Sequence, residues 1–280
     1  VINNAKDLPG YFSMSLKYDI ATNSAVEMSF ISKVSTVAWG LGYFGMPHIL
    51  LRFMAIEDHN KLTLSRRVAT VWVVISLAVA IFIGVVGLGM TNAGAIKFLE
   101  GTASETIIVE ASALLSTYGV IPALLAGVIL AGILASTMST ADSQLIAASS
   151  AVSKNIFGVL KIKQEGKASM IAARATLIVI SVIAAFLARN PDSSVFGIVS
   201  FAWAGFGASF GPVVLFALFW RRSNRFGAIA GLLVGGIMVF VWKYLVRPMG
   251  GVWDVYELLP AFIAASAAII IVSLLTEEPS

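Results

Sequence analysis

The 280-residue chain is 58% hydrophobic and only 12% charged, whereas about a quarter of the residues of an average globular protein carry a charge. A soluble enzyme of this size needs a polar surface, so the composition argues against one. The chain has no cysteine, which excludes disulfides and thiolate metal sites. The net charge of +4 alone would suggest an acidic partner, but its distribution indicates membrane orientation instead.

Apolar runs of about 20 residues, long enough to cross the hydrocarbon as helices, predict an all-α membrane protein with about seven transmembrane helices. The predicted spans are residues 28–51, 68–90, 121–150, 170–189, 195–220, 226–247 and 258–276. The mixed, polar residues 1–27 are typical of a loop between two spans. Because the chain begins with Val1 and has no signal-peptide pattern, we expect it to be truncated upstream.

Basic residues alternate between the two sides of the predicted spans. Twelve follow the first, third and fifth spans: Arg52, Lys61, Arg66, Arg67, Lys154, Lys161, Lys163, Lys167, Arg174, Arg221, Arg222 and Arg225. Four lie in the opposite loops: Lys97, Arg189, Lys243 and Arg247. Because cytoplasmic loops are enriched in lysine and arginine, we expect residues 1–27 outside and the tail cytoplasmic.

The loop over residues 91–120 is too long and too patterned for a simple turn. Its residues 103–117 (ASETIIVEASALLST) predict a short amphipathic helix on the outer face. Both a packing lid over the bundle and a moving gate fit this pattern.

The first span contains residues that break a helix. Residues 39–47 read Trp-Gly-Leu-Gly-Tyr-Phe-Gly-Met-Pro, and three glycines with a proline are poor helix formers. A membrane span that breaks near its middle must satisfy its free backbone groups with protein, water or a ligand, as in transporters with discontinuous helices. Trp39, Tyr43 and Pro47 recur every four residues and share one face if the helix persists. Close helix packing through small residues is the alternative interpretation.

The third span carries a stripe of small and hydroxyl residues. Gly127, Ala131, Ala135, Ser139 and Ser143 recur every four residues, which predicts a flat face for close helix packing.

The inner half of this span is rich in hydroxyl groups. Ser136, Ser139 and Thr140 are spaced i, i+3 and i+4 and therefore lie on one side of the helix. Hydroxyl and carbonyl oxygens suit a hard cation such as sodium. The same hydroxyls can also bond back to their own helix.

Asp142 is the only carboxylate within a predicted span. Because an ionisable residue in a membrane is costly, it marks a functional hypothesis. It could complete a second cation site with Ser143, carry a proton, or form a salt bridge or gate at the cytoplasmic mouth.

The fifth span contains Trp203-Ala-Gly-Phe-Gly-Ala-Ser-Phe-Gly-Pro212, with Gly207 and Gly211 at GxxxG spacing. A bending helix that closes over a solute and a packing motif both fit this sequence. The sixth and seventh spans have no intramembrane carboxylate and are expected to be scaffold.

No Walker loop, nucleotide fingerprint or catalytic triad pattern occurs, so we expect neither an enzyme nor an ATP-driven pump.

Two long motifs resemble the sodium:solute symporter family, and especially its bacterial proline-carrying members. They are WGLGYFGMPHILLRFMA at residues 39–55 and AGILASTMSTADSQL at residues 131–145. The resemblance implies a LeuT-like fold of two inverted five-helix repeats. Residues 28–220 would be the second repeat and residues 221–280 two peripheral spans with a short cytoplasmic tail. The first repeat would lie upstream.

The resemblance also implies roles for single residues. Ser136 would offer a backbone carbonyl to sodium, and Ser139 and Thr140 would offer hydroxyls. Asp142 and Ser143 align with positions that form a second sodium site in some members. The solute pocket would be lined by Trp39, Tyr43 and Pro47. Met46 stands where a glutamine is expected in the proline carriers.

We therefore expect sodium-coupled symport of proline across the plasma membrane, with no cofactor other than the coupling ion. The expected partners are sodium, the solute, the lipid bilayer and the missing N-terminal repeat, and no nucleic acid. The alternatives are symport of another small solute, such as pantothenate, another carboxylate or a sugar acid, and a transporter-like sensor module.

Overall fold

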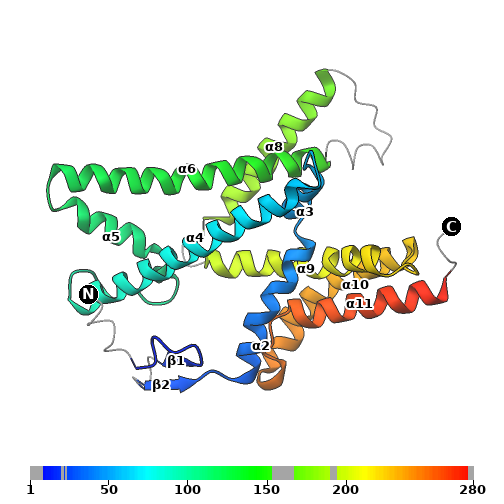
Figure 1. The fold of residues 1–280 in the computed structure, drawn as a ribbon, viewed down its shortest axis with the longest axis horizontal. Helices are drawn as coiled ribbons and strands as arrows, with labels where there is room; N and C mark the ends of the chain where they lie inside the picture. Colours follow the sequence, from blue (N-terminus) through cyan, green and yellow to red (C-terminus); the bar gives the residue numbers. More distant parts are fainter. Residues whose placement is uncertain (1–8, 20–21, 23, 153–166, 190–193, 277–280) are drawn as a thin grey trace. The chain divides into compact units, whose positions relative to one another are not determined.

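The computed structural model describes residues 9–19, 22, 24–152, 167–189 and 194–276 (Figure 1). The chain divides into two compact units. Residues 82–194 form the first unit, and residues 2–81 together with residues 195–280 form the second.

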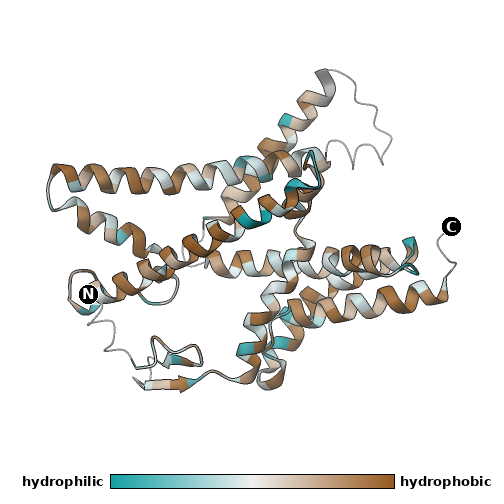
Figure 2. Cartoon of the chain, in the orientation of Figure 1, coloured by the Kyte–Doolittle hydropathy of each residue, from teal (hydrophilic) through white to brown (hydrophobic). Residues whose placement is uncertain are grey.

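Six helices among the described residues are long and apolar enough to cross a membrane. They are α4 (Lys61–Asn92), α6 (Val120–Ser150), α8 (Lys167–Leu187), α9 (Val195–Phe219), α10 (Arg225–Val241) with its extension to Met249, and α11 (Leu258–Leu275). They coincide with six of the seven predicted spans. Figure 2 shows hydrophobic residues along most of α4, α6 and α11. Few residues of α4, α6 and α8 are buried within the protein, so their apolar surfaces need lipid or further protein around them.

The remaining predicted span, over residues 28–51, is not one continuous helix. It comprises α2 (Phe30–Ala38), a 3₁₀ segment η1 (Trp39–Gly45) and α3 (Pro47–Met54). The chain becomes extended at Met46, with φ −77° and ψ 112°, and Pro47 then occupies the start of α3, where its missing N–H costs nothing. The break predicted within residues 39–47 is confirmed, and its position explains why no single helix of membrane length forms here.

A small antiparallel hairpin precedes α2. Strand β1 (Leu16–Asp19) pairs with β2 (Ser24–Glu27), with Leu16 opposite Glu27. The sequence predicted only a polar loop there, so the hairpin adds a two-stranded sheet to the otherwise helical chain. Helix α2 then begins after Ser29, whose hydroxyl accepts a hydrogen bond from the Ser32 N–H at 3.2 Å, as expected for an N-cap.

The first unit is built around α6. Helix α5 (Ile107–Ser116), which follows the 3₁₀ turn η2 (Gly101–Thr106), packs against α6, and α8 also contacts α6. The buried Ser149 donates a hydrogen bond to the Ala173 carbonyl at 2.7 Å, which ties α6 to α8. Helix α5 confirms that residues 103–117 contain a short helix.

The second unit has its core between α9, α10 and α11, which pack side by side (Figure 1). The core consists of small or medium apolar side chains, and Ala204, Ala208, Val239, Leu258 and Ala261 are fully buried. Small residues allow helix backbones to approach closely, which supplies van der Waals contact where a membrane gives no hydrophobic driving force.

Three glycines of α10 at four-residue spacing make this approach possible. A Cβ atom at Gly231 would collide with the Ile269 side chain of α11, and one at Gly227 with the Ser273 side chain and, at 2.9 Å, with the Ile269 carbonyl oxygen. A Cβ at Gly235 would overlap the backbone of Ala208 in α9 more closely. A side chain can rotate away from such a collision, whereas a backbone cannot. Gly235 is therefore the least replaceable of the three.

We expect Gly235→Ala to lower the melting temperature of the full-length protein, because its Cβ would lie 2.8 Å from the Ala208 carbonyl carbon and overpacking costs about 1–3 kcal/mol. The matched control is Gly236→Ala, whose Cβ would meet only the Ser209 hydroxyl at 3.2 Å. Thermal unfolding in detergent measures both. Equal melting temperatures for the two variants would contradict this account of the α9–α10 contact.

Candidate functional site

The broken segment of the second unit carries a cluster of aromatic rings. The ring of Trp39, the first residue of η1, is stacked on Phe196, Trp203 and Tyr256, with centroid distances of 5.4, 5.6 and 5.7 Å. Tyr43 meets the Trp203 ring edge-on at 4.8 Å. The Trp203 indole N–H also donates to the Trp39 carbonyl at 3.1 Å. That carbonyl lies where a regular helix gives way to η1, so the bond satisfies a group near the break.

Glycines allow η1 to lie directly on α9. A Cβ atom at Gly45 would lie 2.5 Å from the Phe206 carbonyl oxygen, and one at Gly207 would lie 2.6 Å from the Gly42 Cα atom. At Gly42 itself, a Cβ would overlap the Trp203 ring. The GxxxG spacing of Gly207 and Gly211 is thus used for close packing, which was one of its two predicted roles.

The three residues predicted to contact a solute are not equivalent in the structure. Trp39 and Tyr43 share the Trp203 ring as a partner, and the Tyr43 side chain is 53% exposed. Pro47 lies beyond the extended Met46 and is exposed. The break prevents the shared helical face from continuing to Pro47. Met46 itself is buried, at 3% exposure.

Tyr256, between α10 and α11, completes the aromatic cluster. Its hydroxyl donates to the Ser200 carbonyl of α9 at 2.6 Å, and its backbone N–H donates to the Ser35 hydroxyl of α2 at 2.9 Å. Burial raises the pKa of the Tyr256 phenol well above its ordinary value, and the neighbouring Glu257 carboxylate raises it further, although Arg247 opposes this. The phenol therefore keeps its proton, and so its bond to Ser200, throughout the physiological range.

The predicted sodium ligands lie on α6 in the first unit. The Thr140 hydroxyl donates to the Ser136 carbonyl at 3.1 Å, and the Ser143 hydroxyl donates to the Ser139 carbonyl at 2.9 Å. All four residues are exposed. The hydroxyls therefore bond back to their own helix, as such groups commonly do.

This back-bonding is compatible with cation binding. A hydroxyl that donates its proton to a carbonyl still has lone pairs available, and each carbonyl oxygen also has a second lone pair. Oxygen ligands of a hard cation lie ~2.3–2.6 Å from it, so neighbouring ligands are roughly 3–4 Å apart. The Thr140 hydroxyl and the Ser136 carbonyl, 3.1 Å apart, have a separation suited to chelating one ion.

Asp142 lies on α6 next to these residues and is exposed. Its carboxylate forms no ion pair that ties it to another part of the described chain, so the three roles predicted for it stay open. The described residues contain no group of three or more His, Cys, Asp or Glu side chains that could hold a metal ion.

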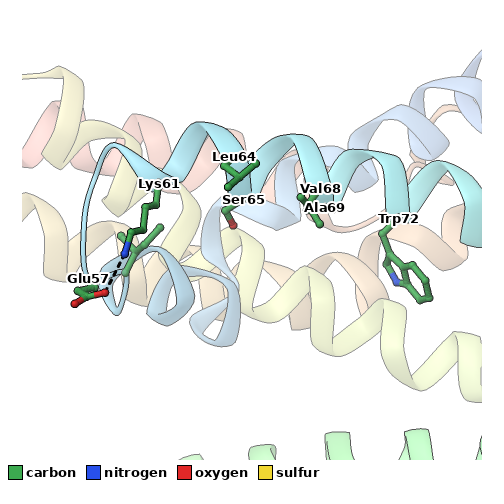
Figure 3. A pocket seen from close by; sticks show the side chains of 8 residues that line it. Glu57, Lys61, Leu64, Ser65, Val68, Ala69 and Trp72 are labelled. Atoms are coloured by element: carbon green, nitrogen blue, oxygen red, sulfur yellow. Dashed lines mark hydrogen bonds and ion pairs between the residues drawn. The ribbon is translucent and has the colours of Figure 1, made fainter.

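A separate depression of about 660 Å³ lies along the first turns of α4 (Figure 3). Its rim carries the ion pair of Lys61 with Glu57, at 3.1 Å, and its wall is formed by Leu64, Val68 and Trp72. None of the predicted site residues lines it. A mainly apolar wall on one helix is a weak candidate for a solute site, because few polar groups converge there.

Sequence reasoning found Trp39 and Tyr43 but not the rings that hold them. Trp203 was visible in the fifth span, yet only as part of a glycine-rich packing motif. Tyr256 lies outside every predicted span, and no periodic pattern connects it to residues more than 200 positions earlier. Its contact arises from tertiary structure alone.

Comparison with known proteins gives concordant results. A family model described as the sodium:solute symporter family matches residues 8–235. The chain is 40% identical over 280 residues to a sodium/proline symporter of Salmonella typhimurium, covering 97% of this chain and 53% of that protein. It is 38% identical to a sodium/proline symporter of Escherichia coli, covering 90% and 49%, and 41% identical to one of Haemophilus influenzae, covering 88% and 48%. The chain thus spans about half the length of these relatives. No solved structure matches.

We expect Gly42→Ala to destabilise the protein, because the added methyl group would overlap the Trp203 ring and displace it from Trp39 and Tyr43. Overpacking of this kind costs about 1–3 kcal/mol. Gly40→Ala is the control, since a Cβ at Gly40 has nothing within 4 Å. Thermal unfolding followed by tryptophan fluorescence compares the variants. A Gly42→Ala variant as stable as Gly40→Ala would argue against the described packing.

Proposed function

Since the chain belongs to the sodium:solute symporter family, we propose that it is part of a secondary active transporter that couples the uptake of proline to the entry of sodium. The relatives named above are sodium/proline symporters, and the six apolar helices fit a multi-pass membrane protein. A transporter of this kind is not an enzyme and uses sodium as its coupling ion rather than a cofactor.

The observation that carries the proposal is the aromatic cluster on a broken span. Discontinuous membrane helices are where secondary transporters form their substrate sites. Here the half-exposed ring of Tyr43 lies beside Trp203, next to the break at Met46. Aromatic faces suit both the apolar ring and the positive nitrogen of proline. We assign Trp39, Tyr43 and Pro47 to the solute site.

The sodium site is assigned to α6. In this proposal the Ser136 carbonyl and the hydroxyls of Ser139 and Thr140 bind the ion, and the remaining ligands come from the N-terminal repeat of the same protein. The 3.1 Å separation of the Thr140 hydroxyl from the Ser136 carbonyl supports it. Asp142 and Ser143 are candidates for a second sodium site.

The proposed mechanism is alternating access in a LeuT-like fold. Residues 28–220 would be the second inverted repeat and residues 221–280 two further spans. Residues 1–27 would lie outside the plasma membrane, and the tail would be cytoplasmic. Sodium binding stabilises an outward-open state, solute binds at the broken span, and closure then carries both inward. One sodium ion entering down the membrane potential contributes about 2.3 kcal/mol per 100 mV, besides its concentration gradient.

We expect the double variant Ser139→Ala with Thr140→Ala to require roughly tenfold more sodium, or more, for half-maximal proline uptake, because two oxygen ligands are lost. The full-length protein in proteoliposomes, with labelled proline and a sodium titration, provides the measurement.

Thr137→Ala is the matched control for this variant. The Thr137 hydroxyl is also exposed and donates to its own helix, at 2.9 Å to the Ile133 carbonyl, but Thr137 lies about 100° around the helix from Ser136 and about 160° from Ser139, and it is not one of the proposed ligands. Its sodium dependence should equal that of the wild type. An unchanged sodium dependence in the double variant would refute the ion site.

Competition between labelled proline and other solutes tests whether proline is the transported solute. We expect unlabelled proline to displace labelled proline at concentrations at least tenfold below those of pantothenate or a sugar acid. Met46 bears on the choice of solute, because a buried methionine at that position offers only a weak sulfur acceptor and no hydrogen-bond donor. Stronger competition by pantothenate would keep sodium symport but reassign the solute. A full-length protein without any sodium-dependent uptake would favour the sensor module.

A further inference from the structure

The connection between α10 and α11, residues 250–257, reaches the segment that carries the proposed solute site. It lies beyond residue 235, where the match to the family model ends. We propose that Tyr256, in this connection, is a positioning residue that fixes the ring of Trp39 for solute binding. The proposal rests on the function proposed above, since it requires that Trp39 contact the solute.

Tyr256 contacts three elements near Trp39. Its ring is stacked on Trp39, with an interplanar angle of 14°. Its backbone N–H bonds to Ser35 of α2, before Trp39 in sequence, and its hydroxyl bonds to Ser200 of α9. At 7% exposure it is the most buried aromatic side chain of this cluster. This one residue therefore connects α2, through its backbone N–H, with η1 and α9, through its side chain, at the ring of Trp39.

The connection is itself held in place on both sides of Tyr256. The Arg247 guanidinium binds Asp254 through Nε and Glu257 through Nη1, each at 2.9 Å. The Glu257 side chain is only 1% exposed, so its carboxylate depends on this partner for charge compensation. The Trp242 indole N–H donates to the Val255 carbonyl at 3.1 Å. Tyr256 is thus presented to Trp39 from a braced segment rather than from a free loop.

Trp39 needs such support because its own segment provides little. A 3₁₀ helix has poorer hydrogen-bond geometry than an α-helix, and the chain leaves helical geometry altogether at Met46. A ring that binds a ligand from an irregular segment keeps one position only if neighbouring groups lock its rotamer. Phe196 and Trp203 provide contacts from α9 to the Trp39 ring. Tyr256 adds a link from Trp39 to α2 and to the start of α11.

The test compares three variants of the full-length protein in sodium-driven uptake of labelled proline. Tyr256→Phe keeps the stacked ring and loses only the hydrogen bond to Ser200. We expect its KM for proline to rise roughly three- to tenfold, as for loss of one hydrogen bond, with kcat within about twofold of the wild type. Tyr256→Leu loses the ring as well and should raise KM further, by about another threefold or more.

The matched control is Tyr244→Leu. Tyr244 belongs to the same unit and contacts the rings of Phe201 and Phe240, but it is 61% exposed and lies in the π-helical segment that continues α10. Its KM should equal that of the wild type. An equal rise in KM for Tyr244→Leu would show a general disturbance and overturn the positioning role.

A second readout reports the site without transport. Since this chain has no cysteine, Gly40→Cys in a cysteine-free full-length background places one thiol beside Trp39, where the structure has open space. Proline should slow its labelling by a maleimide, and Tyr256→Phe should raise the protecting proline concentration by the same factor as KM.

The outcomes separate the two proposals. If the wild type shows no sodium-dependent proline uptake and no protection by proline, the proposed function fails. If the wild type transports and is protected, but Tyr256→Phe and Tyr256→Leu both retain its KM and protection curve, the positioning role of Tyr256 fails while the function stands. Because Tyr256→Phe removes a single oxygen atom, it tests the positioning role even if Tyr256→Leu does not fold.

Discussion

The contact on which the second unit depends is the close approach of two backbones, η1 and α9. Gly42 and Gly45 on one side meet Gly207 and Gly211 on the other, and a Cβ atom at Gly45 or Gly207 would collide with the opposite backbone. In a membrane, apolar side chains gain little by leaving lipid for protein, so packing at short range must supply the attraction. The same contact gives the irregular segment a polar partner, because the Trp203 indole N–H reaches the Trp39 carbonyl. Without it, a broken span would leave backbone groups unsatisfied in hydrocarbon.

The hydroxyls of α6 illustrate a different use of the same kind of residue. Small side chains allow close packing only where another helix is present. A Cβ at Gly127 or Gly132 has nothing within 4 Å, and Ser136, Ser139 and Thr140 are exposed. The Thr140 hydroxyl bonds back to the Ser136 carbonyl, and its lone pairs stay available on the exposed surface of the helix. In the proposed sodium site this face would offer three oxygens, too few to complete a coordination sphere of about six. The proposal that a further repeat supplies the missing ligands follows from this shortage.

The sequence predicts the helices well because their physical basis is local. Runs of about 20 apolar residues place the ends of α6, α8, α9, α10 and α11 within about three residues, whereas α4 begins seven residues before its predicted span. Pro47 and the glycines before it predict the break, since their backbone preferences act within a few residues. The hairpin of β1 and β2 is not predicted, because its short strands in a polar segment carry no clear alternation. The contact between Tyr256 and Trp39 is not predictable from one sequence, because it depends on how α11 packs against η1.

This difference has a consequence for the candidate site. Residues that bind a ligand tend to stand out in the sequence, because they break a local rule, as the glycines and Pro47 do within an apolar span. Residues that hold them in place break no rule. Tyr256 is an ordinary aromatic residue in a short connection, and Arg247 and Glu257 form an ion pair between the end of α10 and the start of α11. They become meaningful only through the distances of 2.6 to 2.9 Å that tie them to α9, α2 and each other. An irregular segment such as η1 does little to fix its own side chains, so in the proposed site the support for Trp39 comes from elsewhere in the chain. In this protein that support comes from the helical hairpin of α10 and α11, which the sequence analysis predicted only to be scaffold.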